Sequence, residues 1–442
     1  MREDHGPGLR DTLRSGGWAI CLLAVPLVVM EQLGREATST LAPDIQAAFG
    51  VGDAVFVAAA GFTGVALTLG GLPMAWLAVR VNRKHLVVAS AAVGTLSLVG
   101  AGLAQNMGQL FAAYACTGLA AAYSNPVFGS LIADAYPAGG RGRIFALHAT
   151  ATPIGQAVGP AFAGSVAALA GGGDAWRWAY LALAVPYALL TVAAAVLLKD
   201  PGRGAPDHRP GAAPVGVVRA FRLMTRVRTF LFMCLGIGVL GLALFTVPVQ
   251  MSLLLGEEYG FDAFERGLLF SLVQLPVIAA MVAGGRQFDR SFRSRPERTV
   301  TVAGAAILGF GAITAGGIWL RPAPLLIACH LLASVCAGLA LVSVSPLVAA
   351  VTSPRMRAQA FAILPVFTFL MGGFLGSVFA GFLSDAHGPR TAISAAVAFS
   401  ALVGGVLFLR ARGHVRGDAA AAAGEPPVPA HPPGPLRHRS GR

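Results

Sequence analysis

Twelve apolar runs, most of them about 20 residues long or longer, constrain this chain more than any other feature of its sequence. A helix that crosses a membrane needs about 20 apolar residues. Inside lipid the backbone must satisfy its own hydrogen bonds, and runs of this length are too long for barrel strands. The runs cover residues 16–39, 54–79, 85–104, 107–133, 144–169, 177–198, 229–255, 264–286, 299–320, 323–350, 358–383 and 390–410. The sequence therefore predicts an all-α polytopic membrane protein with 12 transmembrane helices in two six-helix halves.

The segments between the runs are too short to form a large soluble domain. Only 12% of the 442 residues are charged and 55% are hydrophobic, whereas soluble domains carry about 25% charge. A polar, Pro/Gly-rich and basic stretch separates the halves, and its second part is predicted to be an amphipathic helix on the membrane surface. The predicted order is an N-terminal segment at 1–15, a six-helix half at 16–198, a linker at 199–228, a second half at 229–410 and a disordered tail at 411–442.

The basic residues are distributed very unevenly between the two predicted sides of the membrane. With the N-terminus inside, 28 of the 33 Lys and Arg residues lie on the cytoplasmic side. The other five are Arg35, Arg177, Arg266, Arg321 and Arg390. Because loops rich in Lys and Arg stay in the cytoplasm, both termini and the linker are predicted to be cytoplasmic. The net charge of +13 is thus a topology signal, and we expect no binding of nucleic acid.

Several features argue against a metal site, a cofactor site or an enzyme. The five cysteines lie inside apolar runs and are odd in number, which disfavours a disulfide framework or a zinc site. Gly236, Gly238 and Gly241 form a G-x-G-x-x-G pattern, but no strand precedes it, so nucleotide binding is not expected. No phosphate-binding loop, zinc protease or serine hydrolase motif occurs. We expect a monomer without metal or cofactor that is no enzyme and depends on an ion or substrate gradient.

Two stretches of the first half recur in the second half. Residues 118–126 (GLAAAYSNP) match residues 338–346 (GLALVSVSP) at an offset of 220. Residues 155–164 (GQAVGPAFAG) match residues 372–381 (GGFLGSVFAG) at an offset of 217. Small residues are frequent in this chain, which is the simpler explanation, but two gapless matches in corresponding runs favour a duplication. Paired six-helix halves are a transporter architecture, with the substrate site at mid-depth between them.

The loop after the second run is similar to a signature of the major facilitator superfamily, G-x-L-A-D-R-x-G-R-R. It keeps Leu77, Ala78, Arg80, Arg83 and Lys84, but has Val79 in place of the Asp and Asn82 in place of the second Gly. A second copy after run eight keeps Gly285, Asp289 and Arg290. The resemblance covers residues 16–410 and implies that these charged residues form a cytoplasmic gate. The alternative, stronger for Arg83 and Lys84, is that they only orient the chain.

The fifth run resembles a motif of facilitator antiporters that export their substrates, G-x-x-x-G-P-x-x-G-G. It keeps Gly155, Gly159, Pro160 and Gly164. Glycines allow close helix contact and the proline favours a kink, which suits a contact that opens and closes; ordinary packing is the alternative. The W-R-W stretch at 176–178 is also similar to that of 12-span drug:proton antiporters. Tyr114 departs from the family, because an arginine is expected at its place.

Ionisable residues at membrane depth are costly and are functional candidates by default. Glu31 and Arg35 are four residues apart, so they share one face of their helix. We predict Glu31 as the proton-coupling residue, with Arg35 and His330 as further candidates, and a structural ion pair as the alternative. Glu36 lies closer to the extracellular boundary, where water keeps it charged. Six polar residues are candidates for lining the substrate cavity: Gln32, Tyr123, Asn125, Gln156, Gln250 and Gln274.

These features together predict a secondary transporter that moves a small molecule across the bilayer by alternating access. The resemblance favours proton-coupled efflux across the cell inner membrane, since the Arg-, Ala- and Gly-rich composition is typical of a high-GC bacterial genome. An uptake permease of the same fold is one alternative. A membrane receptor or scaffold that no longer transports is another, made plausible by Val79 and Tyr114.

Overall fold

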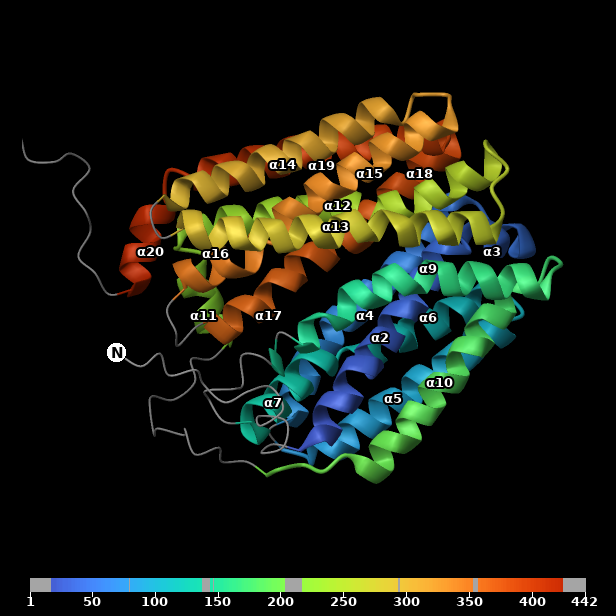
Figure 1. Cartoon of the computed structure of the whole chain (residues 1–442), viewed down its shortest axis with the longest axis horizontal. Coiled ribbons are helices and arrows are strands. Elements are labelled where there is room, and N and C mark those ends of the chain that lie inside the picture. The colour runs from blue at the N-terminus through green and yellow to red at the C-terminus, as the bar shows by residue number, and fades with distance from the viewer. Residues whose placement is uncertain are drawn as a thin grey trace, which may run out of the picture.

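The protein folds into two helical bundles that meet at one end and diverge at the other (Figure 1). The computed structural model describes residues 17–78, 80–136, 144–145, 147–202, 217–292, 295–352 and 357–423. All regular elements in these ranges are helical. The prediction of an all-α polytopic membrane protein is therefore confirmed.

The first bundle is formed by the chain from α2 to α10. Its elements are α2 (Trp18–Thr40), α3 (Ala42–Phe49), α4 (Asp53–Ala78), α5 (Arg83–Leu103), α6 (Met107–Ala121), the π-helix η1 (Ser124–Phe128), α7 (Gly129–Ala135), α9 (Ala151–Ala170) and α10 (Ala175–Leu197). Two asparagines cap its helices, which is a preferred role of this residue. The Oδ1 atom of Asn82 accepts a hydrogen bond from the Lys84 amide at the start of α5, and that of Asn106 does so from the Gln109 amide in α6.

The second bundle begins with a short helix in the linker and ends with a short helix in the tail. Its elements are α11 (Val217–Met224), α12 (Arg228–Glu257), α13 (Ala263–Phe292), α14 (Pro296–Gly317), α15 (Ala323–Leu341), α16 (Val344–Val351), α17 (Arg357–Phe367), the π-helix η2 (Thr368–Gly376), α18 (Ser377–His387), α19 (Pro389–Ala411) and α20 (Val415–Ala423). We call the end of the molecule near α3 the α3 end, and the end near α11 and α20 the α20 end (Figure 1).

Eleven helices in the described part of the chain are long and apolar enough to cross a membrane. The missing fourth span is the segment α6–η1–α7, which a turn at Ala122 and Tyr123 divides into shorter helices. A similar turn at Val342 and Ser343 separates α15 from α16. Together these segments are consistent with the 12 predicted spans.

The two turns have one cause and support the predicted duplication. Proline lacks an N–H group, so the carbonyl four residues earlier in a helix loses its partner. Pro126 lies four residues after Ala122, and Pro346 lies four residues after Val342. The helix breaks in both halves are thus related by the same offset of 220 as the sequence match.

The second sequence match also corresponds to a repeated helix contact. A Cβ atom placed on Gly159 of α9 would lie 2.8 Å from the Glu36 Cβ in α2. A Cβ placed on Gly376, the equivalent residue of η2, would lie 2.9 Å from the Leu242 Cβ in α12. In each half, glycine therefore allows the fifth span to pack closely against the first.

Each bundle has its own apolar core. One cluster contains residues from Ile20 to Leu198 together with Val249, Leu253 and Ala263 of the second bundle, and the other runs from Met224 to Val415. Large apolar side chains also cover the outer faces, as expected where helices contact lipid. They include Leu96, which is 68% exposed, and Leu189, which is 67% exposed.

The structure differs from the sequence predictions in two segments. Run eight was expected to end at residue 286, but α13 continues as a helix to Phe292, so Gly285, Asp289 and Arg290 lie on a helix rather than in a loop. The tail was expected to be disordered from residue 411, but Val415–Ala423 form α20. This helix is held because Asp418 accepts a hydrogen bond from the Thr229 amide at 2.8 Å and Arg416 pairs with Glu297 at 2.8 Å.

Candidate functional site

Helices α9 and α13 join the two bundles near the α3 end. A Cβ atom on Gly164 of α9 would lie 2.2 Å from the Ala263 carbonyl oxygen, and one on Gly267 of α13 would lie 2.2 Å from the Pro160 carbonyl oxygen. The Ala161 amide also donates a hydrogen bond to the Ser271 Oγ at 2.9 Å. Only glycine permits backbones to approach this closely. Two residues of the predicted export motif, Pro160 and Gly164, therefore form a contact between the bundles.

A second contact, between α4 and α18, has the same form. A Cβ atom on Gly381 of α18 would lie 2.5 Å from the Ala54 Cα. The Asp385 carboxylate accepts hydrogen bonds from the backbone amides of Asp53 at 2.7 Å and Ala54 at 3.2 Å, and the Ser384 hydroxyl donates to the Asp53 carboxylate. Asp385 thereby caps the start of a helix in the opposite bundle, where an anion is favoured.

The turn between α2 and α3 provides a third contact at the same end. The Thr40 carbonyl accepts hydrogen bonds from the Ser252 hydroxyl at 2.9 Å and from the Arg266 Nε at 3.2 Å. Arg266 also pairs with Asp44, and its own side chain is only 3% exposed. Burial raises the pKa of Asp44, although Arg266 opposes this rise. Asp44 therefore binds a proton more readily than an exposed aspartate does, and acid weakens this ion pair.

These three contacts define the state of the molecule. The hydrogen bonds and ion pairs that are described between the two bundles lie toward the α3 end. At the α20 end the bundles diverge, as Figure 1 shows for α7 and α17. The protein is thus closed at the α3 end and separated at the α20 end.

Glu31 lies in the middle of α2 and points into the first bundle. Its Oε2 accepts a hydrogen bond from the Ser124 hydroxyl at 2.5 Å, while its Oε1 is buried and has no hydrogen-bond partner. Arg35, one turn later, lies with its guanidinium carbon 5.9 Å from the centre of the Phe369 ring of η2, in the second bundle. The described ion pairs do not include one between Glu31 and Arg35. In this state Arg35 therefore acts on Glu31 through its charge and not through a described ion pair.

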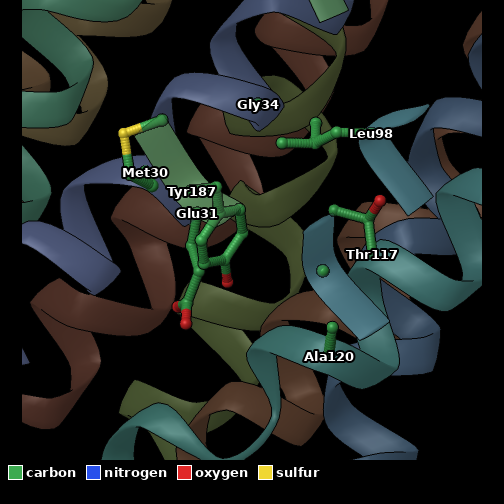
Figure 2. A pocket seen from close by; sticks show the side chains of 8 residues that line it. Met30, Glu31, Gly34, Leu98, Thr117, Ala120 and Tyr187 are labelled. Carbon is green, nitrogen blue, oxygen red and sulfur yellow. The ribbon is translucent and has the colours of Figure 1, made fainter. Parts of the chain in front are cut away.

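Glu31 also lines a small cavity between α2, α5, α6 and α10 (Figure 2). The cavity volume is about 10 Å³, close to the space that one water molecule needs. Its walls are Met30, Glu31, Gly34, Gly94, Leu98, Thr117, Ala120 and Tyr187. Figure 2 shows the side chains of Glu31 and Tyr187 among those around this cavity. The Tyr187 hydroxyl, like Glu31 Oε1, is buried without a hydrogen-bond partner.

Tyr114 occupies the position at which the resemblance led us to expect an arginine. It is 2% exposed, and its hydroxyl forms a hydrogen bond of 2.9 Å with that of Tyr180. The Tyr180 hydroxyl in turn bonds to the Thr38 hydroxyl at 2.9 Å. Tyr114 therefore joins α6 to α10 and α2 by neutral hydrogen bonds within the first bundle, and it leaves no charge at this position.

Arg83 was predicted as a gate residue, but in this state it holds the first bundle together. Its side chain is 2% exposed and pairs with Asp134 at 2.5 Å and Asp200 at 2.6 Å. It also donates to the Gly202 carbonyl at 2.8 Å. Asp134 lies at the end of the fourth span and Asp200 follows the sixth, so the contacts of Arg83 lie within one bundle and the start of the linker. Burial alone would raise the pKa of Asp200, but the hydrogen bonds from Arg83 outweigh it and lower that pKa.

Replacing Asp200 by asparagine is expected to lower the free energy of unfolding by about 3 kcal/mol, because it leaves a buried arginine with one carboxylate fewer. A carboxyl whose pKa is lowered by folding stabilises the protein above its unfolded pKa of about 3.9, and this stabilisation is lost as the pH falls through the folded pKa. The difference between variant and wild type in detergent should therefore be constant from about pH 8 to pH 5 and shrink only below about pH 4.

The matched control is Asp174→Asn, which removes a carboxylate from the exposed pair with Arg177. An exposed pair contributes little, so this variant should unfold like the wild type. If the two variants are equally stable, Arg83 does not hold the first bundle together.

The remaining gate candidates of the first bundle, Arg80 and Lys84, have no described contact with the second bundle. The Arg80 guanidinium stacks on the Trp76 ring, 3.8 Å from its centre. Lys84 follows the capping residue Asn82. The side chains of Gly285, Asp289 and Arg290 lie outside the part of the chain that the structure describes.

The candidate residues for the substrate cavity lie at different depths. Gln32 donates a hydrogen bond to the Glu36 carboxylate at 2.8 Å. Gln250 is fully buried and accepts a hydrogen bond from Ser384 at 2.9 Å, so it belongs to the contact at the α3 end. Tyr123 is fully buried beside η1, where its hydroxyl interacts with the Glu31 carboxylate.

Four further candidates are placed by the structure without polar contacts that assign them a role. Asn125 of η1 is exposed, and Gln156 and Gln274 are half-buried. His330 of α15 is also half-buried, and its ring packs edge-on against Phe270 at a centroid distance of 6.2 Å.

Several residues at the bundle contacts and around Glu31 were not singled out by the sequence. They are Asp44, Asp53, Ser124, Tyr187, Ser271, Phe369, Ser384 and Asp385. Asp53 and Asp385 carry a usable signal as acidic residues at the ends of spans, and Asp44 as one between the first two spans. Ser124, Tyr187 and Ser271 are uncharged residues inside apolar runs, and sequence alone does not separate them from ordinary packing residues.

The sequence as a whole matches a family model. The model of the Major Facilitator Superfamily matches residues 24–323 and 251–440. The chain belongs to the Major Facilitator Superfamily. It is accordingly a multi-pass membrane protein of a transporter family, surrounded by lipid and acting on small molecules. A comparison with curated proteins finds no match.

Solved structures of other facilitator proteins share the fold. A bacterial homologue of the human lysosomal transporter Spinster, in an inward-facing and unoccupied conformation, has a TM-score of 0.79 at 18% identity and covers 93% of this chain and 98% of its own. A D-xylose–proton symporter has a TM-score of 0.69 at 14% identity and covers 90% of this chain and 97% of its own. The nucleoside transporter NupG has a TM-score of 0.69 at 15% identity, with 89% and 98% covered. At these identities the likeness establishes the fold alone.

Proposed function

We propose that this facilitator protein is a proton-coupled exporter of small, partly apolar molecules in the inner membrane of a bacterium. It would work by alternating access, in which the bundles close at one end while they separate at the other. Both termini would lie in the cytoplasm. The structure would then be the state that opens toward the cytoplasm.

The one-sided closure is the observation that carries this proposal. The bundles touch through glycine–backbone contacts at Gly164 with Ala263 and Gly381 with Ala54. The polar contacts described between them lie at the same end. Glycine surfaces fit closely without interlocking side chains, so they separate and re-form at low cost. The two contacts are related by the internal repeat, as expected for bundles that rock against each other around a central site.

Proton coupling is supported by the position of Glu31. It is a carboxyl at membrane depth with one paired and one unpaired oxygen. A buried carboxylate with an unsatisfied oxygen is costly, whereas the neutral acid can be accommodated. When the bundles move and water reaches this site, hydration lowers the free energy of the ionised Glu31 carboxylate. Glu31 would thus bind a proton in one state and release it in the other.

The direction of transport rests on the motif of α9. Gly155, Gly159, Pro160 and Gly164 match a pattern associated with export, and all four are buried against a neighbouring helix. Uptake by the same fold is the second candidate, because a D-xylose–proton symporter shares it. The geometry of Glu31 serves either direction, so transport must be measured.

The direct test uses proteoliposomes that contain a trapped pH-sensitive dye. Compounds that raise the unfolding temperature of the purified protein are added on one side against an imposed pH gradient. For an exporter, a compound on the cytoplasmic face should dissipate a gradient that is acidic on the opposite face. Compounds that bind but leave the gradient unchanged on either side would instead indicate a receptor or scaffold.

Reporter fusions test the proposed orientation. A periplasm-active enzyme fused after Gly172, between α9 and α10, should be active, whereas the same enzyme fused after Ala423, at the end of α20, should be inactive. The reason is the excess of Lys and Arg on the predicted inner side. High activity after Ala423 together with none after Gly172 would reverse the topology and the direction assigned to the open end.

A further inference from the structure

Two of the residues that line the cavity have a buried oxygen atom that no hydrogen bond explains. The oxygen atoms Glu31 Oε1 and Tyr187 OH both lack a partner, and both residues line the same cavity. Buried polar atoms are almost always hydrogen-bonded to protein or to an ordered water molecule. Two such atoms at one cavity therefore point to a shared ligand.

The size of the cavity limits that ligand to one small molecule. Its volume of about 10 Å³ is about what a single water molecule needs. A buried water molecule also needs two to four polar neighbours. Glu31 and Tyr187 provide two, and the Thr117 hydroxyl in the wall is a third, since it donates to Ser97 at 3.0 Å and remains able to accept.

Gly94 leaves space in the facing helix α5 for the Tyr187 side chain. A Cβ atom on Gly94 of α5 would lie 2.8 Å from the Tyr187 hydroxyl. Tyr187 itself is 2% exposed. Glycine at position 94 thus leaves room for the phenol, and a larger residue there would push the hydroxyl away from the cavity.

We propose that the cavity binds one water molecule between Glu31 and Tyr187, and that Tyr187 is a positioning residue that controls proton binding by Glu31. The proposal rests on the proposed function, in which Glu31 carries the coupled proton. The phenol and the water donate hydrogen bonds to the ionised carboxylate. They stabilise it against the neutral acid, so that the proton can leave.

The other charged and titratable groups that face Glu31 are few. Arg35 lies one turn further along α2. The buried hydroxyl of Tyr123, next to Ser124, interacts with the Glu31 carboxylate from the start of η1. The walls from α5 and α6 contribute only Gly94, Leu98, Thr117 and Ala120. Tyr187 is accordingly the titratable residue that shares the cavity with Glu31.

Infrared difference spectroscopy of the full-length protein in lipid tests this inference without a substrate. The C=O band of the protonated Glu31 carboxyl is identified as the band that Glu31→Gln removes during a pH titration. In Tyr187→Phe this band should change frequency, and its midpoint should move upward by about one pH unit, since a hydrogen bond to a charged group contributes about that much. Gly94→Ala, which displaces the phenol, should move the midpoint in the same direction.

Tyr180→Phe is the matched control. Tyr180 lies on the same helix α10, but its hydroxyl bonds to Thr38 and Tyr114, so this variant should leave both frequency and midpoint unchanged. If Glu31→Gln removes a band and Tyr187→Phe does not affect it, the inference is wrong while the proposed function stands. If Glu31→Gln removes no titrating band, the proposed function itself is contradicted.

Discussion

Replacing Glu31 by glutamine is expected to abolish proton-driven accumulation of substrate. Glutamine keeps the shape of the side chain and still accepts the hydrogen bond from Ser124, but it cannot bind and release a proton. A gradient of one pH unit drives about tenfold accumulation in one-for-one exchange, and this ratio should fall to about one. Substrate binding and exchange between equal concentrations should persist.

The measurement is accumulation in proteoliposomes under an imposed pH gradient, with Glu36→Gln as the control. Glu36 lies on the same helix but is bonded to Gln32, so its variant should still accumulate substrate. Unchanged accumulation by Glu31→Gln, with the pH dependence of the wild type, would assign the coupling to another residue.

Replacing Gly164 by leucine should stop transport by preventing closure at the α3 end. Even the first carbon of the new side chain would lie 2.2 Å from the Ala263 carbonyl oxygen. Overpacking of this kind costs about 3 kcal/mol, which is roughly a hundredfold in the population of the closed state. We expect the variant to remain in the membrane, folded, and open at the α3 end. Gly381→Leu, at the related contact with Ala54, should have the same effect.

Gly71→Leu serves as the control for this series. Gly71 lies in helix α4, and a Cβ atom placed there meets nothing within 4 Å. Its variant should transport like the wild type. Full transport by both Gly164→Leu and Gly381→Leu would mean that these close contacts do not have to form during the cycle.

The fold could be predicted because its causes are local. Each span is a continuous apolar run, and the duplication appears directly in two short matches. The broken spans follow from Pro126 and Pro346, whose position in the sequence determines which carbonyl loses its partner. The boundaries at α13 and α20 were missed, since polar residues continue a helix when contacts such as the bond between Asp418 and Thr229 support it.

The site could be predicted only in part, because its contacts join distant parts of the chain. Glu31 was found from its charge at membrane depth. Its partner Ser124 lies 93 residues away, and Asp385 caps a helix that starts 332 residues earlier. For Arg83 the resemblance implied a gate role and chain orientation was the stronger alternative. Its two aspartate partners, at positions 134 and 200, cannot be assigned from spacing. Partners of this kind emerge only when the helices are packed.

Distances between spin labels at the two ends test alternating access most directly. In a chain whose five cysteines are replaced by serine, one labelled pair joins the exposed positions Ala47 and Ala386 at the α3 end. The other pair joins His85 and Arg412 at the α20 end. We expect two distances at each end, and we expect a change of pH to shift their populations in opposite directions at the two ends. In Gly164→Leu the longer distance at the α3 end should predominate. A single distance at each end, unchanged by pH and by Gly164→Leu, would contradict it.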